Sequence, residues 1–212
     1  MDIVNPLAEL YAQQHSTVPE SILQEIEHHT LTNHAHPHMI SGAVQGKFLG
    51  MISEMINPSR VLEIGTFTGY SAICLSKGLT DNGLLHTIEI REDDAALANS
   101  NFKKAGVEHK IKLHVGNALD IIPELEENWD LVFIDADKVS YISYYELTLT
   151  KLRKGGWMII DNVLFHGQVL ESLIKGKNAK SIEEFNNYIA QDPRIEKVML
   201  TIRDGITLIR KR

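Results

Sequence analysis

The sequence predicts an α/β fold: a doubly wound, mostly parallel sheet with helices on both faces, finished by a C-terminal antiparallel hairpin and preceded by N-terminal helices. Three observations support this prediction. Short apolar runs alternate with helical patterns at intervals of roughly 20 to 30 residues. The first run leads into a glycine-rich turn, and two later runs each stop on an aspartate. Because ligands bind at the carboxyl ends of parallel strands, these aspartates indicate a functional edge.

The first 58 residues are predicted to form a helical region in front of the sheet. Apolar residues at helical spacing from residue 5 to about 30 predict two short helices, the second opened by Pro19. Residues 41–57 predict an amphipathic helix, ended by Pro58, whose apolar positions are Val44, Phe48, Met51, Ile52, Met55 and Ile56. We expect one domain over 1–212, with 1–58 as the helical and cap region and 59–212 as the core.

The core alternates strands with helices. The predicted helices cover residues 70–79, 92–105, 119–125 and 141–152. The predicted strands cover residues 61–64, 84–90, 111–115, 131–134, 157–160, 195–202 and 205–210. The last two strands are joined across Asp204 and Gly205, a strong signal for a tight hairpin turn.

One segment breaks this rhythm. Residues 163–180 combine glycines and lysines with little regular pattern, and a loop of that length in a compact domain often forms a lid over a site. Phe165 and His166 in this loop are candidates for the wall of a pocket. A helix over 181–190 is expected to follow, because Ser181 and Glu184 are spaced as a capping box.

The composition favours a globular protein that acts on small molecules. Hydrophobic residues make up 43%, charged residues make up 23%, and the formal net charge is −7 with scattered basic residues, which disfavours a dedicated nucleic-acid surface. The single cysteine, Cys74, is expected to be a packed core thiol. The N-terminal segment lacks a signal-peptide pattern, and no apolar run reaches the ~20 residues of a membrane span, so we expect a cytoplasmic protein.

A histidine-rich stretch precedes the core and raises the possibility of a metal site. It contains His28, His29, His34, His36 and His38. Zinc sites complete four ligands in a closed geometry, whereas this stretch is polar, interrupted by proline and free of cysteine. A loop near a binding site is the favoured interpretation, and a zinc site is the alternative.

The glycine-rich turn indicates a cofactor. Gly65 and Gly69 allow the backbone to turn tightly near a helix N-terminus. Glu63, just before the turn, would repel a pyrophosphate but attract the ammonium group of S-adenosylmethionine, which favours that cofactor over NAD. Glu89, at the end of the second strand, suits the ribose of either cofactor.

Asp135 and Asp161, with the adjacent Asn162, end two strands and offer oxygen ligands suited to Mg²⁺, Mn²⁺ or Ca²⁺. The alternative is that the aspartates cap helices and that Asn162 is a turn residue. Lys138 could act as a general base if a metal and a dry pocket depress its pKa. Taken alone, it would more often be a surface lysine.

Three motifs carry a resemblance to a known family: VLEIGTFTGYSA, FIDADK and IIDN. Over about residues 37–212 the chain resembles the cation-dependent O-methyltransferases, the class I family that includes caffeoyl-CoA and catechol O-methyltransferases and bacterial relatives. The resemblance implies a Rossmann-like methyltransferase fold, divalent-metal ligands at Asp135, Asp161 and Asn162, and Lys138 as the residue that takes the substrate proton. By the same resemblance, S-adenosylmethionine contacts fall on Ser41, Glu63, Gly65, Thr66, Ser71, Glu89, Ala118, Asp135 and Asp137.

The expected activity is transfer of a methyl group from S-adenosylmethionine to a hydroxyl of a catechol-like aromatic molecule, assisted by a divalent cation. The resemblance also implies a homodimer. Two alternatives remain open: methylation of a hydroxylated tRNA uridine, and a non-catalytic module that binds S-adenosylmethionine. An NAD-dependent enzyme is disfavoured by Glu63.

Overall fold

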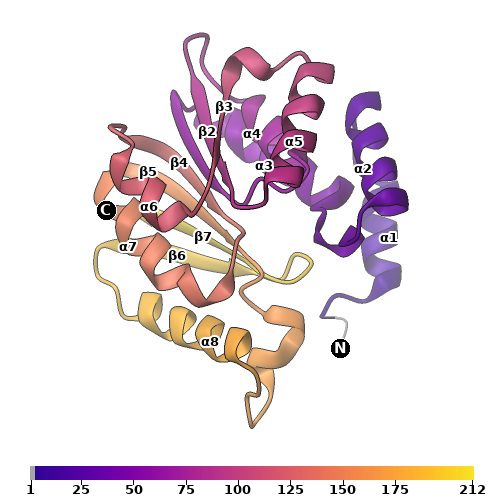
Figure 1. The fold of residues 1–212 in the computed structure, drawn as a ribbon. Coiled ribbons are helices and arrows are strands. Elements are labelled where there is room, and N and C mark those ends of the chain that lie inside the picture. The colour runs from indigo at the N-terminus through magenta and orange to yellow at the C-terminus, as the bar shows by residue number, and fades with distance from the viewer. Residues whose placement is uncertain (1–2) are drawn as a thin grey trace.

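The computed structural model describes residues 3–212 and contains one seven-stranded sheet in the order β3-β2-β1-β4-β5-β7-β6 (Figure 1). The neighbours from β3 to β5 are parallel, and β7 runs antiparallel to both β5 and β6. The predicted doubly wound sheet with an antiparallel C-terminal pair is therefore confirmed. The strands are β1 (Arg60–Ile64), β2 (Leu84–Glu89), β3 (Ile111–Val115), β4 (Trp129–Ile134), β5 (Leu152–Asp161), β6 (Ile195–Leu200) and β7 (Ile206–Lys211).

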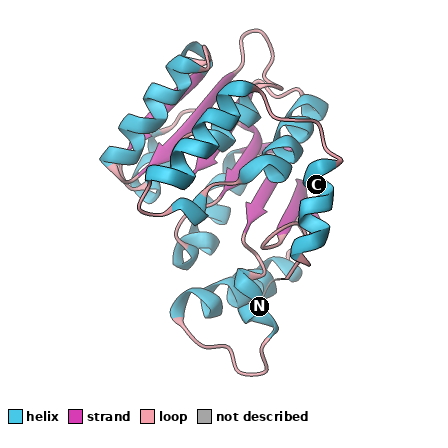
Figure 2. Ribbon diagram, turned by 90° about the vertical axis from the view of Figure 1, so that its right-hand side faces the viewer, coloured by secondary structure: helices cyan, strands magenta, loops and turns pink. Residues whose placement is uncertain are grey.

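Two layers of helices cover the sheet (Figure 2). Because side chains alternate along a strand, Leu62 of β1 packs toward one layer and Val61 toward the other. The first layer contains α6 (Ala118–Glu124), α7 (Tyr141–Lys151) and α8 (Lys177–Ala190). The second contains α3 (Gly42–Ile56), α4 (Tyr70–Ser76) and α5 (Glu92–Lys104).

The two predicted N-terminal helices are present outside the sheet as α1 (Pro6–Gln14) and α2 (Ser21–Asn33), beside the layer of α3 to α5 (Figure 1). Leu23 and Ile26 anchor α2 in the core, whereas α1 has no buried residue. No helix within residues 3–212 has the length and apolar character needed to cross a membrane.

The predicted face of α3 was only partly right: Phe48, Ile52 and Ile56 pack against the core, although they are half-buried. The buried positions of the helix are Gln45, Gly46, Leu49, Gly50 and Ser53, whereas Met51 and Met55 are 55% and 79% exposed. The reason is close helix packing: a Cβ on Gly46 would lie 2.5 Å from the Tyr70 ring of α4. Small residues bring the two backbones together, so the largest apolar side chains do not mark the buried side.

The predicted start of the last helix was also wrong. Helix α8 begins at Lys177 after Gly176, so Ser181 lies within the helix and no side chain caps it. The extra turn forms because Ala179 is fully buried and continues the apolar face of Ile182 and Phe185. The preceding loop is shorter than predicted and contains a 3-10 helix over Phe165–Leu170.

The β6–β7 connection is longer than the predicted tight turn. Strand β6 ends at Leu200 and β7 begins at Ile206, which leaves residues 201–205 between them. Arg203 and Gly205 adopt left-handed backbone conformations, with φ of 47° and 84°. A five-residue turn thus replaces the two-residue turn, and it projects from the same end of the sheet as Asp161 of β5, which pairs with Ile206.

Candidate active site

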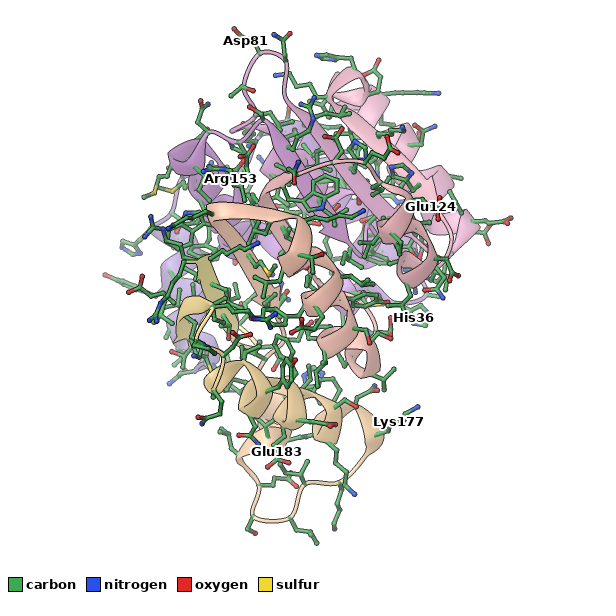
Figure 3. The ribbon with its side chains drawn as sticks, turned by 90° about the vertical axis from the view of Figure 1, so that its left-hand side faces the viewer. His36, Asp81, Glu124, Arg153, Lys177 and Glu183 are labelled. Carbon is green, nitrogen blue, oxygen red and sulfur yellow. The ribbon has the colours of Figure 1, made fainter. Side chains whose placement is uncertain are left out.

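A cavity of about 810 Å³ lies at the carboxyl ends of the central strands. In Figure 3, Asp81 and Arg153 mark the end of the sheet opposite to this cavity, and Lys177, the first residue of α8, lies far below them in the view. All predicted site residues except Glu63 line the cavity: Ser41, Gly65, Thr66, Ser71, Glu89, Ala118, Asp135, Asp137, Lys138, Asp161 and Asn162. The structure therefore brings all but one of the predicted site residues together at the carboxyl edge of the sheet.

The glycine-rich turn lets the ends of β1 and β4 approach each other. Asp135 donates its backbone N–H to the carbonyl of Ile64 at 2.9 Å, and Gly65 has φ of 100°. A Cβ on Gly65 would lie 1.9 Å from the carbonyl oxygen of Asp135. Only glycine fits this position, and its smallness opens the cavity between the two strand ends.

Glu63 lies behind the cavity wall rather than in it. Its carboxyl group is fully buried and accepts hydrogen bonds from the hydroxyls of Ser71 at 2.6 Å and Thr87 at 2.5 Å. Burial raises the pKa of Glu63 to about 8 and outweighs these two bonds. Ser71 lines the cavity, so the direct contact between Glu63 and a ligand ammonium expected from the sequence becomes an indirect one through this hydroxyl.

Backbone amides fix Glu89 at the end of β2. Its carboxylate accepts from the N–H of Phe67 at 2.7 Å and from those of Ile90 and Arg91, each at 3.0 Å. The side chain is only 4% exposed yet borders the cavity. An immobilised acceptor at this strand end suits the hydroxyl groups of a ribose.

Two of the three predicted metal ligands, Asp135 and Asn162, contact the ammonium group of Lys138. Lys138 Nζ donates to Asp135 Oδ1 at 2.9 Å, to Asn162 Oδ1 at 2.7 Å and to the Tyr141 hydroxyl at 2.7 Å. Asp161 joins them, because its Oδ1 accepts the N–H of Asn162 at 2.7 Å. We call the side-chain oxygens of Asp135, Asp161 and Asn162 the oxygen set. Oxygens that lie around an ammonium group also suit a hard divalent cation, because such a cation prefers oxygen ligands.

Neither aspartate caps a helix. Asp137 and Ser140 occupy the N-cap positions after β4, and Leu164 occupies the one after β5. The helix-capping alternative for Asp135 and Asp161 is therefore wrong.

Electrostatics in this oxygen set oppose the simple role expected for Lys138. Burial alone would lower its pKa, but the Asp135 carboxylate and Tyr141 outweigh burial and raise the pKa above its ordinary value. Lys138 is thus held as an ammonium in this arrangement, whereas the depressed pKa was predicted for a site that also holds a metal and stays a prediction. Asp161 behaves differently: burial and the charge of Asp135 raise its pKa to about 7, while a bond from Gln45 opposes the shift.

Several residues in the site were missed by the sequence analysis. Gln45 of α3 donates its Nε2 to Asp161 Oδ2 at 2.5 Å, and Tyr141 donates to the backbone carbonyl of Asp161 at 3.1 Å. Arg203 and Asp204 of the β6–β7 turn also border the cavity. The one available signal was Gln45, a polar residue near the start of a mostly apolar helix.

The predicted loop over the histidine-rich stretch is confirmed only in part, because His28 and His29 lie within α2 and His38 lies in a 3-10 helix over Pro37–Met39. His38 borders the cavity, as expected for a loop near a binding site, and His34 bonds to Asp94 at 2.8 Å to join α2 to α5. Among residues 3–212, no three His, Cys, Asp or Glu side chains converge as a metal site, so the zinc alternative finds no support. The predicted wall residues Phe165 and His166 do line the cavity.

Tyr144 lies between the hydrophobic core and the cavity. It is 3% exposed and packs in the core, yet it borders the cavity and donates its hydroxyl to Asp137. This bond fixes the Asp137 carboxylate at the cavity edge.

Comparison with known proteins matches this architecture. A family model described as O-methyltransferase matches residues 13–212. A probable caffeoyl-CoA O-methyltransferase of Dictyostelium discoideum is 38% identical over 207 residues, covering 95% of this chain and 90% of the relative. A caffeoyl-CoA O-methyltransferase of Nicotiana tabacum is 34% identical over 185 residues, covering 82% of this chain and 77% of the relative.

The comparison with solved structures gives the same family of relatives. The O-methyltransferase from Bacillus cereus in complex with SAH superposes with a TM-score of 0.89 at 29% identity, with 97% of each chain covered. A putative caffeoyl-CoA O-methyltransferase from Staphylococcus aureus gives a TM-score of 0.79 at 27% identity, again with 97% of each chain covered. The fold is thus shared with O-methyltransferases, one of which was solved in complex with SAH.

Proposed function

This chain belongs to the O-methyltransferase family and is an S-adenosylmethionine-dependent enzyme of the caffeoyl-CoA O-methyltransferase type, and we propose that it uses a divalent cation to methylate a catechol-like acceptor. The observation that carries the proposal is the convergence of Asp135, Asp161 and Asn162 beside Lys138 at one end of the cofactor cavity. Mg²⁺ is the proposed ion, with Mn²⁺ and Ca²⁺ as substitutes suited to the same oxygens.

The cofactor is proposed to lie along the glycine-rich turn. Gly65 and Thr66 would face its methionine part, with Ser71 near the ammonium group, and Glu89 would accept from its ribose. Ala118 at the N-terminus of α6 is proposed to border the adenine, and Ser41 and Asp137 to complete the cofactor contacts.

The reaction is a displacement in which an acceptor oxygen attacks the methyl carbon in line with the departing sulfur. When bound, a divalent cation would lower the pKa of the acceptor hydroxyl and orient two neighbouring hydroxyls. With Asp135 and Asn162 holding the cation, Lys138 would lose the contacts that keep it an ammonium and would then release one proton to solvent. As a neutral amine, its Nζ is proposed to receive the hydroxyl proton of the acceptor. Holding the two reactants in line supplies a large part of the rate enhancement.

The acceptor is proposed to lie between the oxygen set and the outer wall formed by His38, Phe165 and His166. Aromatic and imidazole side chains there suit a flat phenol. The relatives from Dictyostelium and Nicotiana carry names that specify caffeoyl-CoA, so this thioester and simple catechols are the two acceptors to compare.

A homodimer is part of the proposal. Its support is the family resemblance, together with apolar side chains that stay exposed on α1 and α3, such as Leu7 at 75% and Met55 at 79%. Light scattering after size exclusion tests it, with a monomer mass as the contradicting result.

Metal removal tests the proposed function. Protein treated with EDTA and dialysed should lose methylation of catechol and caffeoyl-CoA, and Mg²⁺ or Mn²⁺ should restore it. Replacing Asp161 and Asn162 by alanine should lower turnover by about 10³-fold or more, given the size of metal contributions, while S-adenosylmethionine still binds. Asp120→Ala, an exposed aspartate on α6, is the matched control. Turnover that is indifferent to EDTA would refute the metal role.

A further inference from the structure

The turn between β6 and β7 packs directly against the chain segment that follows Asn162. Leu164 donates its backbone N–H to the carbonyl of Asp204 at 2.9 Å, and Val163 donates to that of Gly205 at 3.1 Å. A Cβ on Gly205 would lie 2.5 Å from Leu164 Cγ, so the contact leaves no room for a larger residue. Two side chains of this turn, Asp204 and Arg203, contact carboxamides of the site, those of Asn162 and Gln45.

Asp204 contacts the carboxamide of Asn162. Its Oδ2 accepts from Asn162 Nδ2 at 3.3 Å, and its Oδ1 accepts the N–H of His166 at 2.5 Å, which holds the carboxylate in place. A carboxamide has one donor end and one acceptor end. With Nδ2 bound to Asp204, Asn162 directs Oδ1 toward the centre of the oxygen set, where Lys138 Nζ now lies at 2.7 Å.

Arg203 does the same for a second carboxamide. Its guanidinium Nη1 donates to Gln45 Oε1 at 3.1 Å and to the backbone carbonyls of Ile40 and Ser41. Gln45 therefore turns its Nε2 toward Asp161 Oδ2, at 2.5 Å. Arg203 reaches this position with φ of 47°, a left-handed conformation that costs a non-glycine residue energy.

We propose that the β6–β7 turn is a positioning element of the metal site, in which Asp204 orients Asn162 and Arg203 orients Gln45 and, through it, Asp161. The inference rests on the proposed metal-dependent function. Rotation of Asn162 by half a turn would present an N–H₂ group to the cation in place of an oxygen. Rotation of Gln45 would place its carbonyl against the Asp161 carboxylate. Two adjacent residues of one turn thus prevent both rotations.

Mn²⁺ binding to the full chain, followed by electron paramagnetic resonance, tests the proposal without a turnover assay. Loss of a partner that orients a metal ligand weakens metal binding by about 10- to 100-fold, and this loss is expected for Asp204→Ala and for Arg203→Met. Thr201→Ala, an exposed position in the same turn, is the matched control and should bind Mn²⁺ as the wild type does. S-adenosylmethionine binding within about twofold of wild type, a margin below the energy of one hydrogen bond, shows that Asp204→Ala is folded. For Arg203→Met, which loses a contact to the carbonyl of Ser41, a circular dichroism spectrum like that of the wild type serves as the check.

The Asp204→Ala substitution, made in a protein that carries Asn162→Asp, tests whether Asp204 orients the amide of Asn162 or only holds the turn in place. In Asn162→Asp the ligand has two equivalent oxygens, so there is no amide to orient, and its charge is repelled by Asp204. Adding Asp204→Ala to Asn162→Asp should leave Mn²⁺ affinity unchanged or raise it. An equal loss of affinity in both backgrounds would show that Asp204 only holds the turn and would overturn the inference.

The outcomes also separate this inference from the proposed function. Wild-type protein that binds no Mn²⁺ would overturn the metal site and this inference with it. Wild-type binding that Asp161→Ala abolishes but Asp204→Ala leaves unchanged would overturn the inference alone. If Asp204→Ala fails the cofactor-binding check, Asp204→Asn replaces it. Its amide can still accept from His166 but turns an N–H₂ group toward Asn162, so the same loss is expected.

Discussion

Replacing the buried Glu63 by glutamine should change how the stability of the protein depends on pH. Glutamine is close in shape and keeps both bonds, because its carbonyl can accept from Ser71 and its amide can donate to Thr87. What it removes is the proton of a carboxyl group whose pKa rises from 4.5 in the unfolded chain to about 8 in the folded protein. No other contact of the cavity needs to change.

Proton linkage gives the sign and the size of the change in unfolding free energy with pH. The folded state holds a proton on Glu63 that the unfolded state releases above pH 4.5, so the wild type loses stability as pH rises toward 8. The slope is about 1.4 kcal/mol per pH unit, which gives a loss of about 3 kcal/mol between pH 5 and pH 7 relative to Glu63→Gln. A bound ammonium near Ser71 favours the ionised carboxylate, so saturating S-adenosylmethionine should reduce this loss.

The assay is urea unfolding of wild type and Glu63→Gln at pH 5, 6, 7 and 8, with and without S-adenosylmethionine. Subtracting the two proteins cancels the titration of every other group. A difference in unfolding free energy that grows with pH, and shrinks with the cofactor, is the expected result. Parallel pH curves for the two proteins would refute the conclusion that burial keeps Glu63 protonated.

Two further predictions concern Gly65 and His86. Gly65→Ala should abolish S-adenosylmethionine binding or folding, because its Cβ would lie 1.9 Å from the Asp135 carbonyl oxygen; normal cofactor affinity by calorimetry would contradict this. Burial and the neighbouring His114 lower the pKa of His86 to about 4, so stability from this pair is present above pH 6.5 and is lost as pH falls toward 4. In thermal melts from pH 7 to 4.5, His86→Phe should therefore lose less stability than wild type, and an equal loss in both would be inconsistent with a buried neutral His86.

The sequence predicted the parts of the site that depend on local pattern. Asp135 and Asp161 were found because each ends a short apolar strand, and parallel strands bring their carboxyl ends to one edge. Gly65 was found because a strand-to-helix turn near a ligand requires glycine. Each of these patterns spans only a few residues, so it can be recognised without knowledge of tertiary contacts.

The parts that were missed depend on residues far apart in the chain. Gln45 meets Asp161 across 116 positions, and Arg203 meets Gln45 across 158. The predicted face of α3 was wrong at Met51 and Met55 because Gly46 and Gly50 set the packing, and periodicity gives weight only to large apolar residues. The raised pKa of Lys138 in this arrangement comes from its contacts with Asp135 and Tyr141, which no local pattern showed. The depressed pKa was predicted for a site that holds a metal, and it stays a prediction.

A crystal grown with S-adenosylhomocysteine and soaked in Mn²⁺ tests the central claim most directly, through the anomalous signal of the metal. The account predicts one strong peak within about 2.0 to 2.4 Å of oxygens from Asp135, Asp161 and Asn162, with Lys138 Nζ moved away from Asp135 and Asn162. A cofactor-loaded site without that peak, with Lys138 still bonded to Asp135 and Asn162, would contradict it.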